Sequence, residues 1–219
     1  SAEPLLSVRE ACARLLREFA PLPAETIPLP QSPGRVLATE VVAAADLPAF
    51  DNSSMDGYAV RAADVRAAPA RLPVRADIPA GDGLPAPLPP GAAARIMTGA
   101  PLPPGADAVV PVEQTDDPRR SAGGPPPDFV QIRRAPKAGE HVRRVGEDLR
   151  AGTPVLAAGT LLRAQEVGLL AALGCAQVQV VRRPRVAVLS TGDELLGVDE
   201  MDAPGKIRDV NGQTLPALA

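Results

Sequence analysis

The chain has 219 residues, of which 45% are hydrophobic, and carries a formal net charge of −3 from 23 basic and 26 acidic side chains. This length and apolar content predict a globular protein of one or two domains. The basic residues are interspersed with acidic ones, which argues against nucleic acid as a partner. No apolar run approaches the roughly 20 residues that span a bilayer, and residues 1–20 lack the order of a signal peptide. We therefore expect a cytoplasmic protein with no membrane partner.

The first predicted element is an amphipathic helix. Ser7 followed by Glu10 makes a capping box, and apolar residues recur at helical spacing from Val8 until Pro21 and Pro23 end the pattern. Beyond this helix, 27 prolines and 19 glycines with only 2% aromatic residues predict many short strands and turns. The core must then be built from Ala, Val, Leu and Ile.

A compact β-domain is predicted from Tyr58 to about Val145, where short apolar runs alternate with turns rich in Pro and Gly. The runs comprise residues 72–74, 94–97, 108–112 and 129–132. Residues 116–128 are the most loop-like portion of this stretch, and we interpret them as a mobile hairpin tip or connection.

The last part of the chain predicts a helix and then a strand pair. Residues 164–173 have an apolar helical face, and Gly174 supplies a C-terminal stop. Residues 176–181 and 185–189 are β-rich runs that lead into a loop, a step typical of α/β proteins. A parallel sheet needs more strands and covering helices than the remaining residues supply. We therefore expect the amino-terminal portion of a longer protein, with residues after about Ser190 poorly supported in isolation.

The two cysteines and the one histidine offer little chemistry. Cys12 and Cys175 lie far apart in apolar helix-like settings, which predicts two buried thiols and favours the cytoplasm. Neither cysteine fits a zinc motif, and His141 has no neighbour to complete a ligand cluster, so we interpret it as a surface residue. The sequence contains no Ser/His/Asp or Cys/His set, which argues against hydrolytic chemistry.

The segment 48–60 gathers two of the four aromatic residues around Asp51, Asn52 and Asp56, and we call its residues 48–56 the acidic loop. It allows two interpretations. The loop aims its oxygens at a ligand while Phe50, Met55 and Tyr58 fix its backbone and Gly57 permits positive φ; alternatively, the acids only cap backbone amides in a structural turn. Spacing alone favours the structural turn.

Other polar groups also occupy predicted loops. Thr98 and the amides near Gly99 suit a small oxyanion, although the same run is a Pro-rich turn. Pairs of acids that suit Mg²⁺ occur at 51 and 56, 147 and 148, and 193 and 194. Acids repel an oxyanion unless a cation compensates. The candidate arginines are Arg61, Arg95, Arg143 and Arg144. Gly192 lies where a backbone either passes close to a ligand such as phosphate or turns sharply at the end of a strand, and no nucleotide fingerprint surrounds it.

Five motifs, taken in order, carry a family resemblance. They are Phe50–Ala59 (Phe-Asp-Asn-Ser-Ser-Met-Asp-Gly-Tyr-Ala), Arg95–Pro101, Gly105–Pro111, Gly146–Asp148 and Ser190–Leu195. Together they resemble the MoeA-type molybdopterin molybdenumtransferases, the family that includes the gephyrin E domain. The resemblance covers nearly the whole chain from the first helix to residue 219.

The resemblance implies a mixed α+β fold, with a β-rich inserted domain on a helix-containing linker domain and the start of a MogA-like α/β domain. The implied linker and dimerisation domain is discontinuous and comprises residues 1–48 and 141–183. The inserted β-domain comprises residues 49–140, and residues 184–219 begin a truncated α/β pterin-binding domain.

The resemblance further implies molybdenum cofactor biosynthesis, in which molybdate is inserted into adenylylated molybdopterin with release of AMP and assistance from Mg²⁺. It implies that Asp56 and Glu147 hold metal or position water, and that Thr98 contacts the oxyanion. The implied substrate-binding residues are Asp51, Asn52, Ser53, Gly99, Ser190, Thr191, Gly192, Asp193, Asp209 and Asn211.

Members of this family are similar in forming a homodimer whose active site pairs the β-domain of one subunit with the α/β domain of the other. This chain would then supply half a site and bind substrate without turnover. A MogA-type adenylyltransferase is a further implied partner. The alternative is a non-enzymatic dimeric scaffold of the gephyrin E type, but a scaffold needs neither the acidic loop nor Thr98. A β-domain that binds sugars or anions lacks an aromatic platform here.

Overall fold

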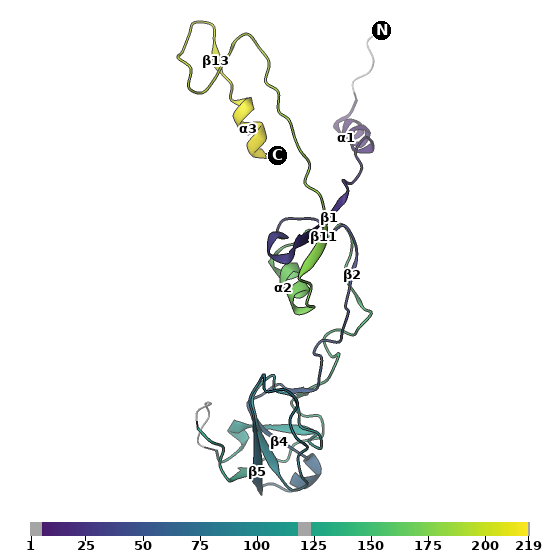
Figure 1. Cartoon of the computed structure of the whole chain (residues 1–219), viewed down its shortest axis with the longest axis vertical. Helices are drawn as coiled ribbons and strands as arrows, with labels where there is room; N and C mark the ends of the chain where they lie inside the picture. The colour runs from purple at the N-terminus through teal and green to yellow at the C-terminus, as the bar shows by residue number, and fades with distance from the viewer. Residues whose placement is uncertain (1–5, 118–123, 219) are drawn as a thin grey trace. The chain divides into compact units, whose positions relative to one another are not determined.

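The computed structural model describes residues 6–117 and 124–218 and divides the chain into two compact units. The first unit comprises Ser1–Thr39, Ala158–Val167 and Ala176–Ala219, and the second comprises Glu40–Ala157 and Gly168–Cys175. Figure 1 colours both units by residue number. The loop predicted at residues 116–128 lies partly outside the described residues.

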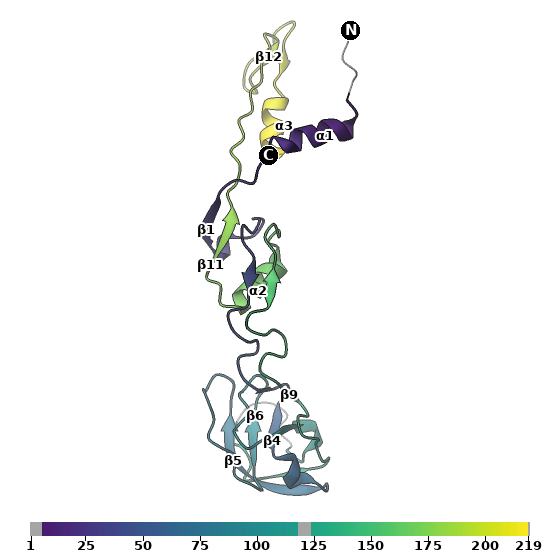
Figure 2. The same cartoon turned by 90° about the vertical axis from the view of Figure 1, so that its right-hand side faces the viewer.

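A five-stranded sheet forms the centre of the second unit (Figure 2). Its order is β7-β4-β6-β5-β8, and only the pair β5 and β6 is parallel. The bounds are β4 Gly57–Val60, β5 Ala70–Ile78, β6 Ala93–Ile96, β7 Ala108–Pro111 and β8 Phe129–Ile132. Each of the apolar runs predicted as strands overlaps one of these elements, so this part of the prediction is confirmed.

The core of this unit lies on both faces of the sheet. Tyr58 and Val60 of β4 pack in one apolar cluster, while Ala59, which lies between them, packs in another. Successive side chains of a strand point to opposite faces, so each face of β4 is covered. Every residue of β4, β6 and β7 is buried, and for this reason these strands show no alternation of apolar and polar residues; the one charged residue among them is Arg95 of β6.

Gly57 is needed in β4 for a reason that the sequence did not reveal. Gly57 is not one of the described glycines with positive φ, so the prediction that it adopts positive φ is wrong. A Cβ at this position would instead meet the carbonyl oxygen of Val110 at 2.0 Å. The glycine lets β7 approach the start of β4, which follows directly after the acidic loop.

The aromatic residues near this loop differ in their roles. Tyr58 is fully buried, and its hydroxyl donates to Asp117 Oδ2 at 2.6 Å. Phe50 is 43% exposed, so its ring is only partly buried, and its anchoring of the loop stays a prediction.

Short elements complete the second unit. Strand β3 (Asn52–Ser53) pairs with β9 (Val142–Arg143), and β2 (Val41–Val42) pairs with β10 (Pro154–Leu156), both antiparallel. The 3₁₀ turns η2 (Ala62–Val65) and η3 (Val112–Gln114) follow β4 and β7.

The first unit begins with helix α1 (Val8–Arg17), whose N-terminal capping box of Ser7 and Glu10 is confirmed. Strand β1 (Ala24–Pro28) pairs antiparallel with β11 (Gln177–Val181), and η1 (Leu29–Gln31) follows β1. Strands β12 (Leu195–Leu196) and β13 (Ile207–Arg208) form a parallel pair before helix α3 (Asn211–Leu218). The chain therefore has a mixed α+β fold.

Helix α2 (Ala164–Ala172) ends as the sequence predicted. The amide of Gly174 donates to the carbonyl of Ala171, and the amide of Cys175 donates to that of Leu170. These two bonds form a Schellman motif, which satisfies carbonyls at the end of the helix.

Two predictions about this part of the chain are wrong. Residues 185–189 form no strand, and β11 pairs with β1 from the start of the chain. Cys12 is exposed and Cys175 is half-buried, because α1 buries none of its residues and Cys175 follows the last turn of α2. In the described part of the chain, no helix is both long and apolar enough to cross a membrane.

Candidate functional site

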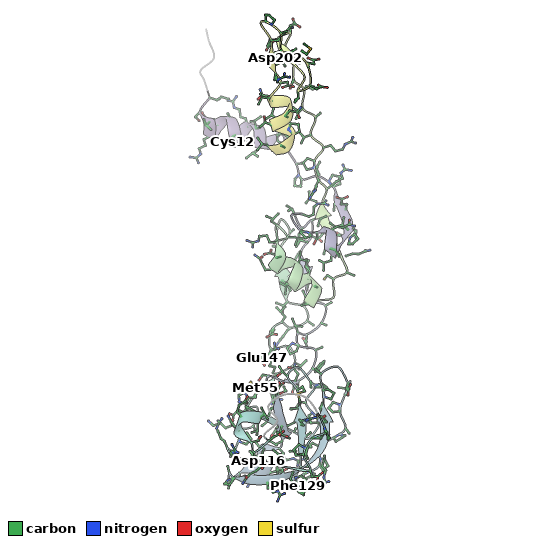
Figure 3. All side chains as sticks on the ribbon, turned by 90° about the vertical axis from the view of Figure 1, so that its left-hand side faces the viewer. Cys12, Met55, Asp116, Phe129, Glu147 and Asp202 are labelled. Carbon is green, nitrogen blue, oxygen red and sulfur yellow. The ribbon has the colours of Figure 1, made fainter. Side chains whose placement is uncertain are left out.

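Three loops of the second unit meet at one end of its sheet, and we call residues 51–56, 97–101 and 141–148 the three-loop cluster. Strand β3 connects them, because Asn52 lies opposite Arg143 on one side and forms a bridge with Pro101 on the other. Figure 3 shows the labelled residues Met55 and Glu147 at the same end of this unit, with Phe129 of β8 toward the other end. The cluster thus gathers seven of the predicted site residues, namely Asp51, Asn52, Ser53, Asp56, Thr98, Gly99 and Glu147.

Asp56 and Thr98 are in direct contact within the cluster. Asp56 Oδ1 accepts from both the amide and the hydroxyl of Thr98, each at 2.7 Å. These bonds, the one from the amide first, lower the pKa of Asp56 and keep the carboxylate ionised. Thr98 lies in a tight turn that is closed by the Ala100 amide, which donates to the Met97 carbonyl.

The amides near Thr98 are not free to bind an anion, contrary to the prediction. The Thr98 amide is bonded to Asp56, and the Gly99 amide donates to the Ser53 carbonyl at 2.8 Å. The reason is that the turn lies against β3 and the acidic loop, whose oxygens accept these bonds first.

Asp51 joins the acidic loop to the third loop. Its Oδ1 accepts from the Val145 amide at 2.8 Å, and its Oδ2 pairs with Arg144 Nη1 at 2.6 Å. The Val145 amide first, and then Arg144, lower the pKa of Asp51. Asp51 therefore holds the guanidinium of Arg144, whose side chain is 53% exposed, at the edge of the cluster.

Glu147 follows a glycine that the turn requires. Gly146 has φ 68° and donates its amide to the Pro48 carbonyl. The Glu147 carboxylate then accepts from the Arg144 amide at 2.7 Å. The Gly-Glu-Asp motif thus forms a turn that lies against the start of the acidic loop.

The carboxylates of the cluster differ in charge compensation. Asp51 pairs with Arg144 and Asp148 pairs with Arg143. Among the described residues, no ion pair involves Asp56 or Glu147, which accept from neutral donors. The carboxylates of Asp56 and Glu147 are therefore available to interact with a ligand, a proton or a cation.

Asn52 and Ser53 lie beneath the surface of the cluster. Asn52 is 4% exposed and donates from Nδ2 to the Phe50 carbonyl, while its Oδ1 is buried without a partner. The Ser53 hydroxyl, which is fully buried, donates to the carbonyl of Met55 and accepts from its amide. Both side chains shape the acidic loop, and their contact with substrate stays a prediction.

Two of the candidate arginines lie outside the cluster. Arg95 on β6 makes two hydrogen bonds to Asp77 and is mostly buried, and Arg61 lies 3.9 Å from Asp64. Only Arg143 and Arg144 belong to the cluster. The sequence could not show which of the four arginines lie near the predicted acids, because this depends on which strands are neighbours in the fold.

His141 is the residue whose role the sequence analysis missed. It has φ 56°, and its carbonyl accepts from the Ser54 amide at 3.0 Å. Histidine belongs with asparagine and aspartate among the residues enriched at positive φ, which was the only available signal.

The remaining predicted residues lie in the first unit. An open pocket of about 470 Å³ there is lined by Ser190, Thr191, Asp209 and Asn211, together with the charged residues Glu194 and Arg208 and with apolar residues. The Gly212 amide and then the Ser190 hydroxyl lower the pKa of Asp209. Gly192 and Asp193 are not among the lining residues, and the Asp193 carbonyl accepts from Lys206.

The same acids, Asp56 and Glu147, are the candidate ligands for a magnesium ion. Within residues 6–117 and 124–218, no three His, Cys, Asp or Glu side chains gather as a metal-binding group. Asp56 and Glu147 each already accept amide hydrogen bonds. The donor set of the described residues therefore does not fit a magnesium ion by itself.

Comparison with known proteins places this geometry in a family. Residues 6–174 match the family described as the MoeA N-terminal region (domain I and II). The chain is 48% identical over 209 residues to molybdopterin molybdenumtransferase 2 of Mycobacterium tuberculosis (strain CDC 1551 / Oshkosh), covering 94% of this chain and 49% of that protein. It is 46% identical over 198 residues to the molybdopterin molybdenumtransferase of Nostoc sp. (strain PCC 7120 / SAG 25.82 / UTEX 2576), covering 89% of this chain and 44% of that protein.

A solved structure agrees with this relationship. The crystal structure of the molybdopterin biosynthesis moeA protein from Pyrococcus horikoshii OT3 is similar with a TM-score of 0.85 and 35% identity, covering 98% of this chain and 56% of that chain. The chain spans about half the length of the curated relatives it matches.

Proposed function

Because the chain belongs to the MoeA family, we propose that the whole protein acts in molybdenum cofactor biosynthesis as a molybdopterin molybdenumtransferase. The proposed reaction inserts molybdate into adenylylated molybdopterin and releases AMP. The three-loop cluster is the proposed contribution of this chain to the active site.

The contact between Asp56 and Thr98 carries the proposal. The amide and the hydroxyl of Thr98 both donate to one carboxylate oxygen of Asp56. Because one of these donors belongs to the backbone, the Asp56 carboxylate is held in a fixed position. Preorganised charge of this kind stabilises a transition state without reorganisation during the reaction. Asp56 is also uncompensated by any cation among the described residues, which leaves its charge available.

The charges of the cluster divide the proposed roles. Asp56 and Glu147 repel an approaching molybdate, so they suit positioning of water or transfer of a proton better than direct contact with the oxyanion. The exposed guanidinium of Arg144 suits an anionic group such as phosphate, because its planar donors match oxyanion geometry. Thr98 then contacts the oxyanion only if its hydroxyl exchanges Asp56 for the substrate.

The proposed roles of these residues do not require magnesium. The acids of this chain do not form a metal site by themselves, and no step above depends on the ion. Ligands from substrate phosphates or from another subunit would have to complete the site.

The three-domain division remains a proposal, with bounds 1–48 and 141–183, 49–140, and 184–219. Residues 184–219 would begin a MogA-like pterin-binding domain, in which Ser190, Asp193, Asp209 and Asn211 contact the substrate. A homodimer with a shared active site, a MogA-type partner and a cytoplasmic location belong to the same proposal. The 219-residue chain alone would then bind substrate without turnover.

The proposal is tested with the full-length protein, molybdate and adenylylated molybdopterin, by measuring active cofactor and AMP. We expect Asp56→Asn to lose most turnover, because the substitution removes the uncompensated charge while preserving the shape of the side chain. Asp116→Asn is the matched control, since Asp116 also accepts from a backbone amide, that of Gln131, and lies outside the three-loop cluster. Full activity of Asp56→Asn, or an inactive wild-type protein, would contradict the proposal.

A further inference from the structure

His141 is the one described non-glycine residue with a left-handed backbone, at φ 56°. Such a conformation is disfavoured for residues with a Cβ and persists only where the surrounding structure requires it. The residue lies at the start of β9, where the third loop of the cluster turns to run alongside the acidic loop.

The backbone of His141 connects to both predicted acids. On one side, its carbonyl accepts from the Ser54 amide, which lies two residues before Asp56. On the other side, the chain leaves His141 into β9, whose Arg143 lies opposite Asn52. Arg144 and Glu147 follow directly, with the Arg144 amide bonded to the Glu147 carboxylate. A change of φ at His141 would therefore displace both loops.

The imidazole has different neighbours. Its Nε2 lies 3.8 Å from Glu140 Oε1, and this carboxylate already pairs with Arg134 at 2.7 Å and accepts from the Lys137 amide. These contacts belong to the turn that precedes the cluster. Among the described residues, the ring makes no hydrogen bond or ion pair with Asp51, Asp56, Thr98 or Glu147.

We propose that His141 is a positioning residue of the three-loop cluster, and that it acts through its left-handed backbone while its imidazole takes no part in the chemistry. The inference rests on the proposed function for its activity readout only. It adds to the site a residue that orients Asp56 and Glu147 together.

The test uses three substitutions in the full-length protein. His141→Gly and His141→Asn retain turnover and its pH profile, because glycine and asparagine accept positive φ. His141→Val lowers kcat by about tenfold or more, since a β-branched residue at positive φ is strained and a tenfold loss needs only a small displacement of the reacting groups. The difference in kcat between His141→Val and His141→Asn distinguishes an effect of the backbone conformation from an effect of losing the imidazole.

Gly91→Val is the matched control for general destabilisation. Gly91 also has positive φ, at 70°, and a Cβ there would meet nothing within 4 Å. It lies just before β6, at the opposite end of that strand from the turn that holds Thr98. We expect this variant to lower the melting temperature as His141→Val does, but to keep its kcat.

A second readout does not depend on activity. Hydrogen exchange of the Ser54 amide should accelerate in His141→Val and stay at the wild-type rate in His141→Asn and Gly91→Val. An inactive wild-type protein with this exchange pattern would refute the proposed function and leave the inference standing. The inference is wrong if His141→Asn loses as much turnover as His141→Val, or if His141→Val leaves Ser54 exchange and kcat unchanged.

Discussion

Asp56 Oδ1 accepts both the amide and the hydroxyl hydrogen bonds of Thr98, so one carboxylate oxygen closes the contact between the acidic loop and the turn after β6. Two variants of Thr98 separate its contributions. Thr98→Ser keeps both donors, Thr98→Val removes only the hydroxyl, and neither removes the backbone amide. We expect the loss of the hydroxyl to cost about 1 kcal/mol of folding free energy or less, because the pair lies at the surface.

Activity should respond more strongly than stability to these variants. Thr98→Val in the full-length protein should lose molybdenum insertion, while Thr98→Ser should retain it. The measurement is cofactor formation beside urea unfolding of both variants. Equal activity of the valine and serine variants would exclude a role of the hydroxyl in the reaction.

Gly57→Ala should strongly destabilise the second unit. The added Cβ would meet the Val110 carbonyl oxygen at 2.0 Å, and backbone atoms cannot move away without opening the pair β4 and β7. Overpacking of this kind costs about 1–3 kcal/mol or more.

Gly168→Ala is the matched control for Gly57→Ala. Gly168 lies inside α2 with nothing within 4 Å of an added Cβ, so this substitution should stabilise by about 0.5–1 kcal/mol. Unfolding free energies of both variants check the pair. A Gly57→Ala protein as stable as wild type would mean that β7 has another position open to it.

Tyr58→Phe should destabilise the same unit by about 1–3 kcal/mol, because it removes the buried hydroxyl that donates to Asp117. The double variant Tyr58→Phe with Asp117→Asn should cost less than the sum of the single ones, since the two groups share one bond. A double-mutant cycle measured by denaturant unfolding gives the coupling energy. Additive effects would show that the bond contributes nothing.

Glu166 predicts a pH dependence of stability. Its bonds with Arg163 lower its pKa from 4.5 to about 2. A carboxyl group whose pKa is lower in the folded protein stabilises it above the unfolded pKa, and this stabilisation is lost as the pH falls from about 4.5 toward 2. Glu166→Gln should therefore destabilise the protein more at pH 6 than at pH 3. The same loss at both pH values in urea unfolding would count against the shift.

Local patterns were predicted well because their causes are local. The capping box of Ser7 and Glu10 and the Gly174 stop each depend on residues within one or two helical turns. The strands of the second unit were predicted correctly because a short apolar run between turn residues must be buried, whichever strand becomes its neighbour. The family motifs indicated Asp56, Thr98 and Glu147, and the structure brings the first two into direct contact.

The sequence by itself therefore determined the type of most elements, the family and the set of candidate acids. Only the tertiary structure decided that β11 pairs with β1, that Gly57 allows a close approach of β7, and that Arg144 and Arg143 compensate Asp51 and Asp148. It also decided that Asp56 and Glu147 have no ion-pair partner in the described part of the chain. These features depend on contacts between residues far apart in the chain, such as Asp51 with Arg144 and Ala24 of β1 with Val181 of β11. Residue spacing contains no information on which distant partner a carboxylate or a strand edge meets, because strand register and neighbour order are set by packing of the whole unit.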